Sequence, residues 1–155
     1  MQIEKRIKVV EVVALGMDPP VVADASTPLR DVIRQMRDQR SGCALLTRDA
    51  KLAGIFTERD VVLRIVGVEG AMEQPVCDWM TPDPDRVGQK DPLNMAVRLM
   101  RRRGFRNVPV VDEADHVIGC VRHKDIVAYL AEVYPEQVLN LPPDPDQVVL
   151  EREGG

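Results

Sequence analysis

The stretch that decides how this chain folds reads Gly54-Ile55-Phe56-Thr57-Glu58-Arg59-Asp60, because a related pattern returns as Gly119-Cys120-Val121-Arg122-His123-Lys124-Asp125. In each stretch a glycine is followed by two apolar residues, and an aspartate ends the pattern. Self-similarity of this kind is the sequence signature of a repeated structural unit. We therefore expect the chain to contain two copies of one unit.

An amphipathic helix is expected before each of these stretches. Thr27-Pro28-Leu29 begins one helical pattern, and Asp91-Pro92-Leu93 begins the other. Proline is tolerated in the first helical turn, and Thr and Asp are favoured N-cap residues, so we predict N-caps at Thr27 and Asp91. The helical spacing i, i+3, i+4, i+7 is met by Leu29, Val32, Ile33 and Met36, and by Leu93, Ala96, Val97 and Met100.

Short strands complete each unit. The apolar runs 43–46 and 108–111 read as buried strands, and each is followed by a polar turn. A second strand then contains Gly54 in one unit and Gly119 in the other. Extended chain is expected to lead into each unit, at Val21 and Val22 and at Arg86 and Val87.

The predicted fold class is mixed α/β (α+β), with two pseudo-symmetric β-α-β-β-α repeats packed sheet to sheet, because one such unit has too little core to stand alone. Residues 1–68 form an N-terminal arm and the first repeat, and residues 69–85 form a linker rich in Pro and Asp. The second repeat occupies 86–135, and 136–155 is a tail without periodicity.

Composition excludes several classes of function. The 155-residue chain carries a net charge of -4, which argues against nucleic acid as a partner. Its three cysteines lie far apart with no CxxC pair, so neither a disulfide framework nor a metal site is expected. The sequence shows no signal region and no apolar run of bilayer length, which predicts a cytoplasmic protein without membrane contact. It shows no catalytic motif either, so we expect no catalytic residue and no enzyme activity.

The repeated stretch resembles the ligand motif of CBS domains, in which a glycine, two apolar residues, Thr or Ser and then Asp follow in order. Gly104–Asp112 resembles the start of a strand in that family, and Val76–Pro82 resembles the usual lead-in to a repeat. The resemblance extends from Val9 to Tyr134. It implies a tandem pair of CBS domains, called a Bateman module, with two equivalent clefts between the repeats. Such modules commonly bind AMP, ADP or ATP and pair into homodimers.

The first cleft, as the resemblance implies it, joins the Thr57 segment to the second repeat. Asp60 would accept hydrogen bonds from the ribose hydroxyls, and Thr57 would present its hydroxyl and nearby N–H groups to a phosphate. From the residues alone, Thr57 and Asp60 also fit a capping box at the start of a helix. The resemblance also implies contacts from Arg59 and Arg106 to phosphate and a hydroxyl from Thr81. The backbone of Asn107 and Val108, with Val87 from the entering chain, would bracket the adenine.

The second cleft would join Ser41, Gly42 and Cys43 to the repeated stretch of the second unit. Asp125 keeps the ribose position, but Arg122 stands where the family has Thr or Ser. Two hypotheses remain open here: Arg122 and Lys124 bind a more highly phosphorylated ligand, or Arg122 fills the cleft and leaves it empty.

The leading functional hypothesis is therefore a regulatory sensor of adenosyl nucleotides that acts on a separate partner protein. One alternative is a structural dimerisation module without a ligand. The other is nucleic-acid binding through the basic run from Arg101 to Arg106, although cations at a helix C-terminus before Gly104 explain Arg101, Arg102 and Arg103 without any ligand.

Overall fold

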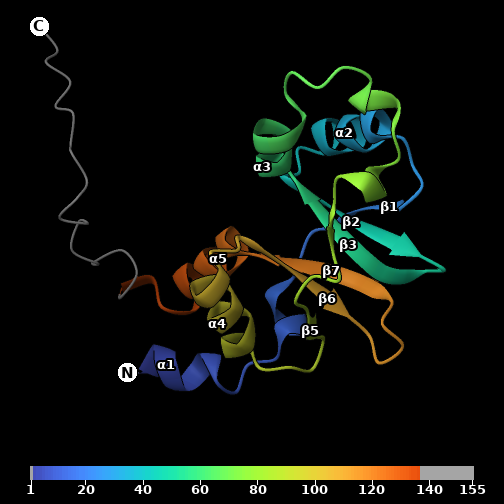
Figure 1. Ribbon diagram of the computed structural model, residues 1–155. Helices are drawn as coiled ribbons and strands as arrows, with labels where there is room; N and C mark the ends of the chain where they lie inside the picture. Colours follow the sequence, from blue (N-terminus) through green and yellow to red (C-terminus); the bar gives the residue numbers. More distant parts are fainter. Residues whose placement is uncertain (1, 137–155) are drawn as a thin grey trace, which may run out of the picture.

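The computed structural model describes residues 2–136 of the chain. Two β-sheets face each other, and helices lie on the outer side of each sheet (Figure 1). This is the mixed α/β architecture that the repeated pattern predicts. Of the predicted tail, only residue 136 lies within the described residues.

The first repeat is built on a four-stranded sheet with the order β1-β2-β3-β4. Strand β1 (Val21–Asp24) runs parallel to β2 (Cys43–Arg48), and helix α2 (Leu29–Asp38) connects them. β2 turns into the antiparallel β3 (Lys51–Thr57) through Asp49 and Ala50, whose φ angles of 52° and 64° suit a two-residue hairpin turn. The unit ends with α3 (Glu58–Asp60) and the π-helical turn η2 (Val61–Ile65).

The second repeat follows the same order of elements. Strand β5 (Val87–Gly88) runs parallel to β6 (Asn107–Val111) through helix α4 (Leu93–Arg103). β6 pairs with the antiparallel β7 (Val117–Arg122), which leads into helix α5 (His123–Val133). The predicted repeat is therefore confirmed in the fold.

The two sheets pack against each other through residues of their central strands. Successive side chains of a strand point to opposite faces, so β2 contributes to two cores. Ala44 and Leu46 lie in the core under α2, whereas Cys43 and Leu45 join Val111 of the second repeat in a core between the sheets. The predicted packing of sheet against sheet is confirmed.

The segment that precedes each repeat packs on the other repeat. The N-terminal arm, with α1 (Gln2–Ile7) and η1 (Val12–Leu15), joins the core of the second repeat. The linker, with η3 (Ala71–Glu73) and η4 (Val76–Asp78), joins the core of the first, and its strand β4 (Thr81–Pro82) extends the first sheet. Each repeat is thus completed by the segment that leads into the other repeat.

The two N-cap predictions are wrong. Pro28 and Pro92 occupy the N-cap positions of α2 and α4, and neither helix has a side-chain cap. The exchanged segments explain why none is needed. The N–H of Leu29 donates to the carbonyl of Gln74 at 2.8 Å, and the N–H of Leu93 donates to that of Val10 at 2.7 Å.

Candidate functional site

Thr57 and Asp60 of the first cleft lie where β3 passes into α3. The backbone N–H and the hydroxyl of Thr57 both donate to Asp60 Oδ2, at 2.8 and 3.0 Å. This is the capping box that the two residues alone predict. Oδ1 of Asp60 accepts no hydrogen bond within residues 2–136, and its nearest cation, Arg64, is 3.6 Å away. One carboxylate oxygen therefore stays available to a ligand.

Two other first-cleft residues face away from any cleft. The side chains of Val87 and Val108 are buried in the core of the second repeat, with 1% and 0% exposure. Only their backbone atoms are therefore able to line a ligand site. For Val108 a backbone contact with the adenine is what we expect, and the burial of Val87 limits that residue to its backbone as well; both contacts stay predictions.

The remaining first-cleft residues are exposed or half-buried, and they lie on α3 and at or just before the starts of β4 and β6. Thr81 lies in β4, paired in register with Ile55 of β3, and Arg59 is exposed on α3. Arg106 is exposed just before β6, which begins at Asn107. Within residues 2–136, no hydrogen bond or ion pair joins any of these residues to Thr57 or Asp60. Their grouping into one site remains a prediction.

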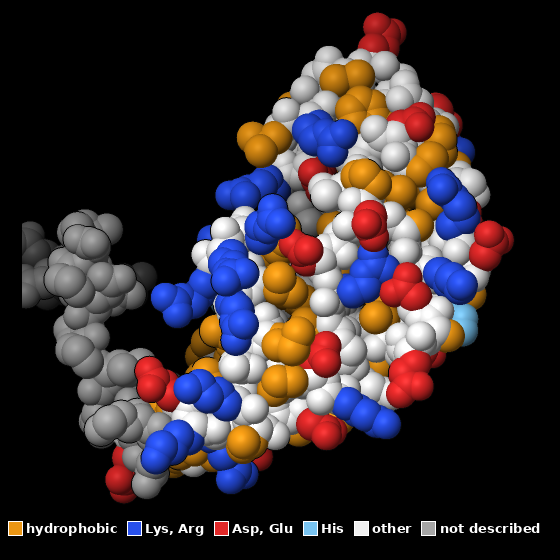
Figure 2. Space-filling view, turned by 60° about the horizontal axis from the view of Figure 1, so that its bottom comes forward, with side chains coloured by type: hydrophobic (Ala, Val, Ile, Leu, Met, Phe, Trp, Pro, Cys, Tyr) orange, Lys and Arg blue, Asp and Glu red, His pale blue; other side chains and the backbone are white. Residues whose placement is uncertain are grey.

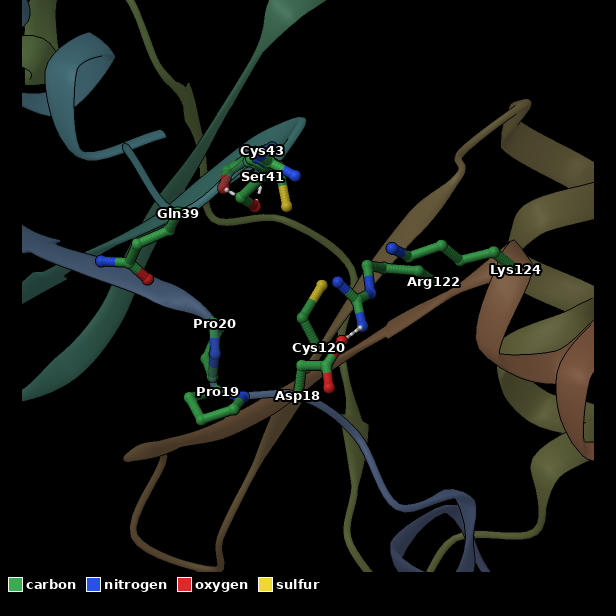
Figure 3. A pocket seen from close by; sticks show the side chains of 10 residues that line it. Asp18, Pro19, Pro20, Gln39, Ser41, Cys43, Cys120, Arg122 and Lys124 are labelled. Carbon is green, nitrogen blue, oxygen red and sulfur yellow. Dashed lines mark hydrogen bonds and ion pairs between the residues drawn. The ribbon is translucent and has the colours of Figure 1, made fainter. Parts of the chain in front are cut away.

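The second cleft contains a cavity of about 370 Å³ between the two repeats (Figure 3). From the predicted set, Ser41 and Cys43 line it on the side of the first repeat, and Arg122 and Lys124 line it on the side of the second. Gly42 sits beside them, with its carbonyl accepting a hydrogen bond from the N–H of Glu58 at 3.0 Å. The structure therefore brings together the two halves that the repeated pattern pairs.

Arg122 forms the most densely bonded group of this cleft. Its Nε and one Nη donate to the two carboxylate oxygens of Asp125, each at 2.9 Å. The same Nη donates to Asp18 at 2.7 Å. Hydrogen bonding to Asp125 raises the pKa of Arg122, and hydrogen bonding from Arg122 lowers the pKa of Asp18. A guanidinium cannot accept a hydrogen bond, so the hydroxyl half of the Thr57 capping box has no counterpart here.

Two thiols face each other across the cavity wall. Figure 3 shows the sulfur atoms of Cys43 and Cys120 pointing toward one another from the two sheets. Both residues are buried and free of disulfides. Hydrogen bonding to Cys43, followed by burial, raises the pKa of the Cys120 thiol. Because that thiol stays protonated, this wall of the cleft is uncharged at Cys120.

Sequence reasoning missed six residues that line the cavity. They come from the chain before β1, from the end of α2 and from β7. Thr81, in the chain that leads into the second repeat, is an expected first-cleft residue. The same reasoning applied to the first repeat would have pointed to the chain before β1. The sequence signals at the other positions are weaker. The six residues are Asp18, Pro19, Pro20, Gln39, Arg40 and Cys120.

Basic side chains gather along one edge of the molecule in Figure 2, and acidic and basic side chains are both spread over the rest of that face. Arg101, Arg102 and Arg103 form the last turn of α4, and Gly104 follows in a left-handed conformation with φ of 68°. These positions agree with the explanation that the three arginines are cations at the C-terminus of a helix.

No helix among residues 2–136 is both long and apolar enough to span a membrane. The same residues contain no cluster of three or more His, Cys, Asp or Glu suited to a metal ion.

Comparison with known proteins identifies this architecture. A family model described as CBS domain matches residues 10–67 and again residues 76–132. A CBS domain protein from Pyrobaculum aerophilum, solved in complex with AMP, superposes with a TM-score of 0.69 at 26% identity, over 79% of this chain and 99% of that one. A CBS-domain containing protein from Agrobacterium tumefaciens superposes with a TM-score of 0.68 at 25% identity, over 77% and 98% of the two chains.

Curated relatives differ widely in length. An uncharacterized protein of Methanocaldococcus jannaschii is 27% identical over 147 residues, which cover 74% of this chain and 88% of the relative. The meiotically up-regulated gene 70 protein of Schizosaccharomyces pombe is 28% identical over 120 residues, but the match spans only 16% of that protein. The same unit therefore occurs both nearly alone and as a small part of a larger chain.

Proposed function

The chain belongs to the CBS domain family, and from that premise we propose that it is a regulatory module whose first cleft binds an adenosyl nucleotide such as AMP. Nucleotide binding would be read by a separate partner protein in the cytoplasm. The free thiols of Cys43, Cys77 and Cys120 agree with a reducing compartment. The Pyrobaculum aerophilum relative, complexed with AMP, supports the ligand class.

The state of Asp60 is the observation that carries this proposal. One of its carboxylate oxygens caps α3 through Thr57, and the other accepts no hydrogen bond within residues 2–136. The side chain keeps 15% of its surface exposed. Because the hydrogen bonds from Thr57 already fix the orientation of this carboxylate, little conformational entropy of Asp60 is lost when a ribose hydroxyl binds.

Calorimetric titration with AMP tests the role of Asp60. We expect Asp60→Ala to weaken AMP binding by about tenfold or more, because a hydrogen bond to a charged group contributes about 1.5–3 kcal/mol. Asp125→Ala is the matched control, since Asp125 holds the same position at the start of α5, and we expect it to leave AMP affinity unchanged. Thermal unfolding of each variant verifies that it is folded.

Two results would reject the proposal. One is the absence of binding of AMP, ADP and ATP at millimolar concentration to the folded wild-type chain. The other is an AMP affinity of Asp60→Ala equal to that of the wild type.

A structural dimerisation module is the second candidate function, favoured by apolar side chains that the fold leaves exposed. Val62, Leu63 and Val66 on and after η2 have exposures of 68%, 73% and 72%, and Val127 on α5 has 55%. In Figure 1, α3 and α5 lie toward the same end of the two sheets, each with its own repeat. Burial of such residues against a second copy would remove apolar surface from water.

Light scattering tests this pairing. We expect the wild-type chain to have twice the mass of one chain, and we expect Leu63→Lys to shift the population toward the monomer because it buries a charge in the interface. A monomeric wild type at micromolar concentration would remove this candidate.

A further inference from the structure

Two cysteines from different repeats meet in the core between the two sheets. Cys43 lies on β2 and Cys120 on β7, and both belong to the buried cluster that joins the sheets. Their sulfur atoms point toward one another (Figure 3), and both residues line the cavity of about 370 Å³. Both thiols are free. A bond between the two sulfur atoms would therefore tie one sheet to the other.

The first cleft has no such pair at the matching positions. The register between the strands matches Cys43 with Asn107, and the position after the repeated glycine matches Cys120 with Ile55. An amide and an aliphatic side chain thus take the place of the two thiols. Because the same fold is built there without cysteine, packing alone does not account for two thiols that face each other.

The two thiols differ in acidity. Hydrogen bonding from Cys120 lowers the pKa of the Cys43 thiol; burial opposes this change, and hydrogen bonding from Ser41 adds to it. Hydrogen bonding to Cys43, together with burial, raises the pKa of Cys120. The thiolate, and not the thiol, attacks a disulfide. Cys43 is therefore the thiol that reacts first, and Cys120 is the one that completes the bond.

We propose that Cys43 and Cys120 form a reversible disulfide that locks the two repeats together when the surrounding thiol pool becomes oxidised. The oxidant is a low-molecular-weight disulfide such as glutathione disulfide. The Cys43 thiolate attacks one sulfur of this oxidant, which forms a mixed disulfide and releases one glutathione thiolate. Cys120 then loses its proton to solvent and attacks the Cys43 sulfur, which forms the protein disulfide and releases the second glutathione thiolate.

Two electrons pass in this exchange from the protein thiols to glutathione disulfide, which is reduced to two molecules of glutathione. Disulfides that form in reducing compartments are usually transient and often sense the redox state. Cys43 and Cys120 are each only 3% exposed, so the oxidant has to reach them from the cavity, and we expect a slower reaction than at an exposed thiol. The inference goes beyond the proposed function and does not depend on nucleotide binding.

Oxidation of the folded wild-type chain with glutathione disulfide, followed by trypsin digestion and mass spectrometry without reduction, tests this inference. Trypsin cleaves after Lys and Arg, so it leaves Cys43, Cys77 and Cys120 in separate peptides, 41–48, 65–86 and 107–122. We expect peptide 41–48 to be joined to peptide 107–122, and Cys77 to stay outside that bond. Dithiothreitol should separate the two peptides again.

The same oxidation in concentrated urea is the matched control. Cys43 and Cys120 are the most distant pair of cysteines along the chain, and closing a longer loop costs more entropy in an unfolded chain. We therefore expect bonds to Cys77 to predominate in urea. A bond between Cys43 and Cys120 that predominates only without urea would come from the native arrangement of the two sheets.

Thermal unfolding measures the lock itself. A disulfide that closes so long a loop should raise the melting temperature of the oxidised wild type by roughly 4–16 °C. Cys120→Ala, treated in the same way, should show no rise, because Cys43 then has no partner. Cys77→Ala is the control variant and should keep the whole rise.

Four results would overturn the inference. They are the absence of joined peptides after oxidation of the folded chain, a bond that involves Cys77, a bond between two chains on a non-reducing gel, and a cross-linked chain whose melting temperature is not raised. The peptide map of the wild type decides the question even if Cys120→Ala fails to fold. A failure of the first-cleft proposal looks different, because AMP would then fail to bind while the disulfide still formed.

Discussion

The two repeats place an aspartate at the same point of the same fold, yet they leave it in different states. In the first repeat, Asp60 accepts two hydrogen bonds from Thr57 through one oxygen and leaves the other oxygen without a hydrogen bond among the described residues. In the second, both oxygens of Asp125 are taken by Arg122. Arginine in place of threonine thus makes the difference: Asp60 keeps an oxygen available as an acceptor, whereas both oxygens of Asp125 are bonded to a guanidinium.

The comparison shows that a repeated motif preserves the backbone conformation more reliably than it preserves the interactions of the side chains. Asp60 and Asp125 both sit in the first turn of the helix that ends their repeat. What each aspartate is free to bind depends on the neighbour three positions earlier. A site copied between repeats by alignment alone would therefore assign the same role to two groups with different chemistry.

The exchanged lead-in segments extend this comparison to stability. Met80 of the linker lies against Gly54 of the first repeat, and Met17 of the N-terminal arm lies against Gly119 of the second. A Cβ at Gly54 would collide with Met80 Sδ and approach its Cγ to 2.8 Å, whereas a Cβ at Gly119 would approach the terminal Cε of Met17 to 2.8 Å. The first contact involves most of a side chain, and the second involves its flexible end.

Gly54→Ala is therefore expected to have the largest effect on stability. Overpacking of a filled core costs about 1–3 kcal/mol, and each kcal/mol lowers the melting temperature by roughly 2–4 °C in a chain of this size. Thermal unfolding measures this loss. A melting temperature equal to that of the wild type would show that Met80 does not pack on Gly54 as described.

Gly119→Ala is expected to have a smaller effect, within about 1 kcal/mol, because the methyl group of Met17 is able to rotate away. The same thermal unfolding series measures it beside Gly54→Ala. A larger loss at Gly119 than at Gly54 would reverse the order that the two contacts predict.

Much of the fold could be predicted because it depends on local pattern. The apolar spacing of Leu29 and Leu93 marks the two helices, and the runs around Leu45 and Val110 mark the central strands. These residues are fully buried, so burial and sequence pattern point to the same positions. The spacing of these apolar residues reflects which face of each helix or strand packs on the core, so it is visible in a single amino-acid sequence.

Other features could not be predicted because they depend on contacts between distant segments. The carbonyls of Val10 and Gln74 replace the expected helix caps, and neither residue stands out in the sequence. The ion pair of Arg122 with Asp18 joins residues 104 positions apart. Arg40 carries no sign of its left-handed conformation in its residue type, and it becomes conspicuous only beside Gly104 at the matching position.

The most direct test of this account is the number of AMP molecules bound by Arg122→Thr, which gives the second repeat the residue that the first repeat has at Thr57. Removing the guanidinium would free Asp125 as an acceptor. Calorimetry should therefore find one AMP per chain in the wild type and two per chain in the folded variant. A folded Arg122→Thr chain that still binds one AMP would contradict the claim that Arg122 alone separates the two clefts.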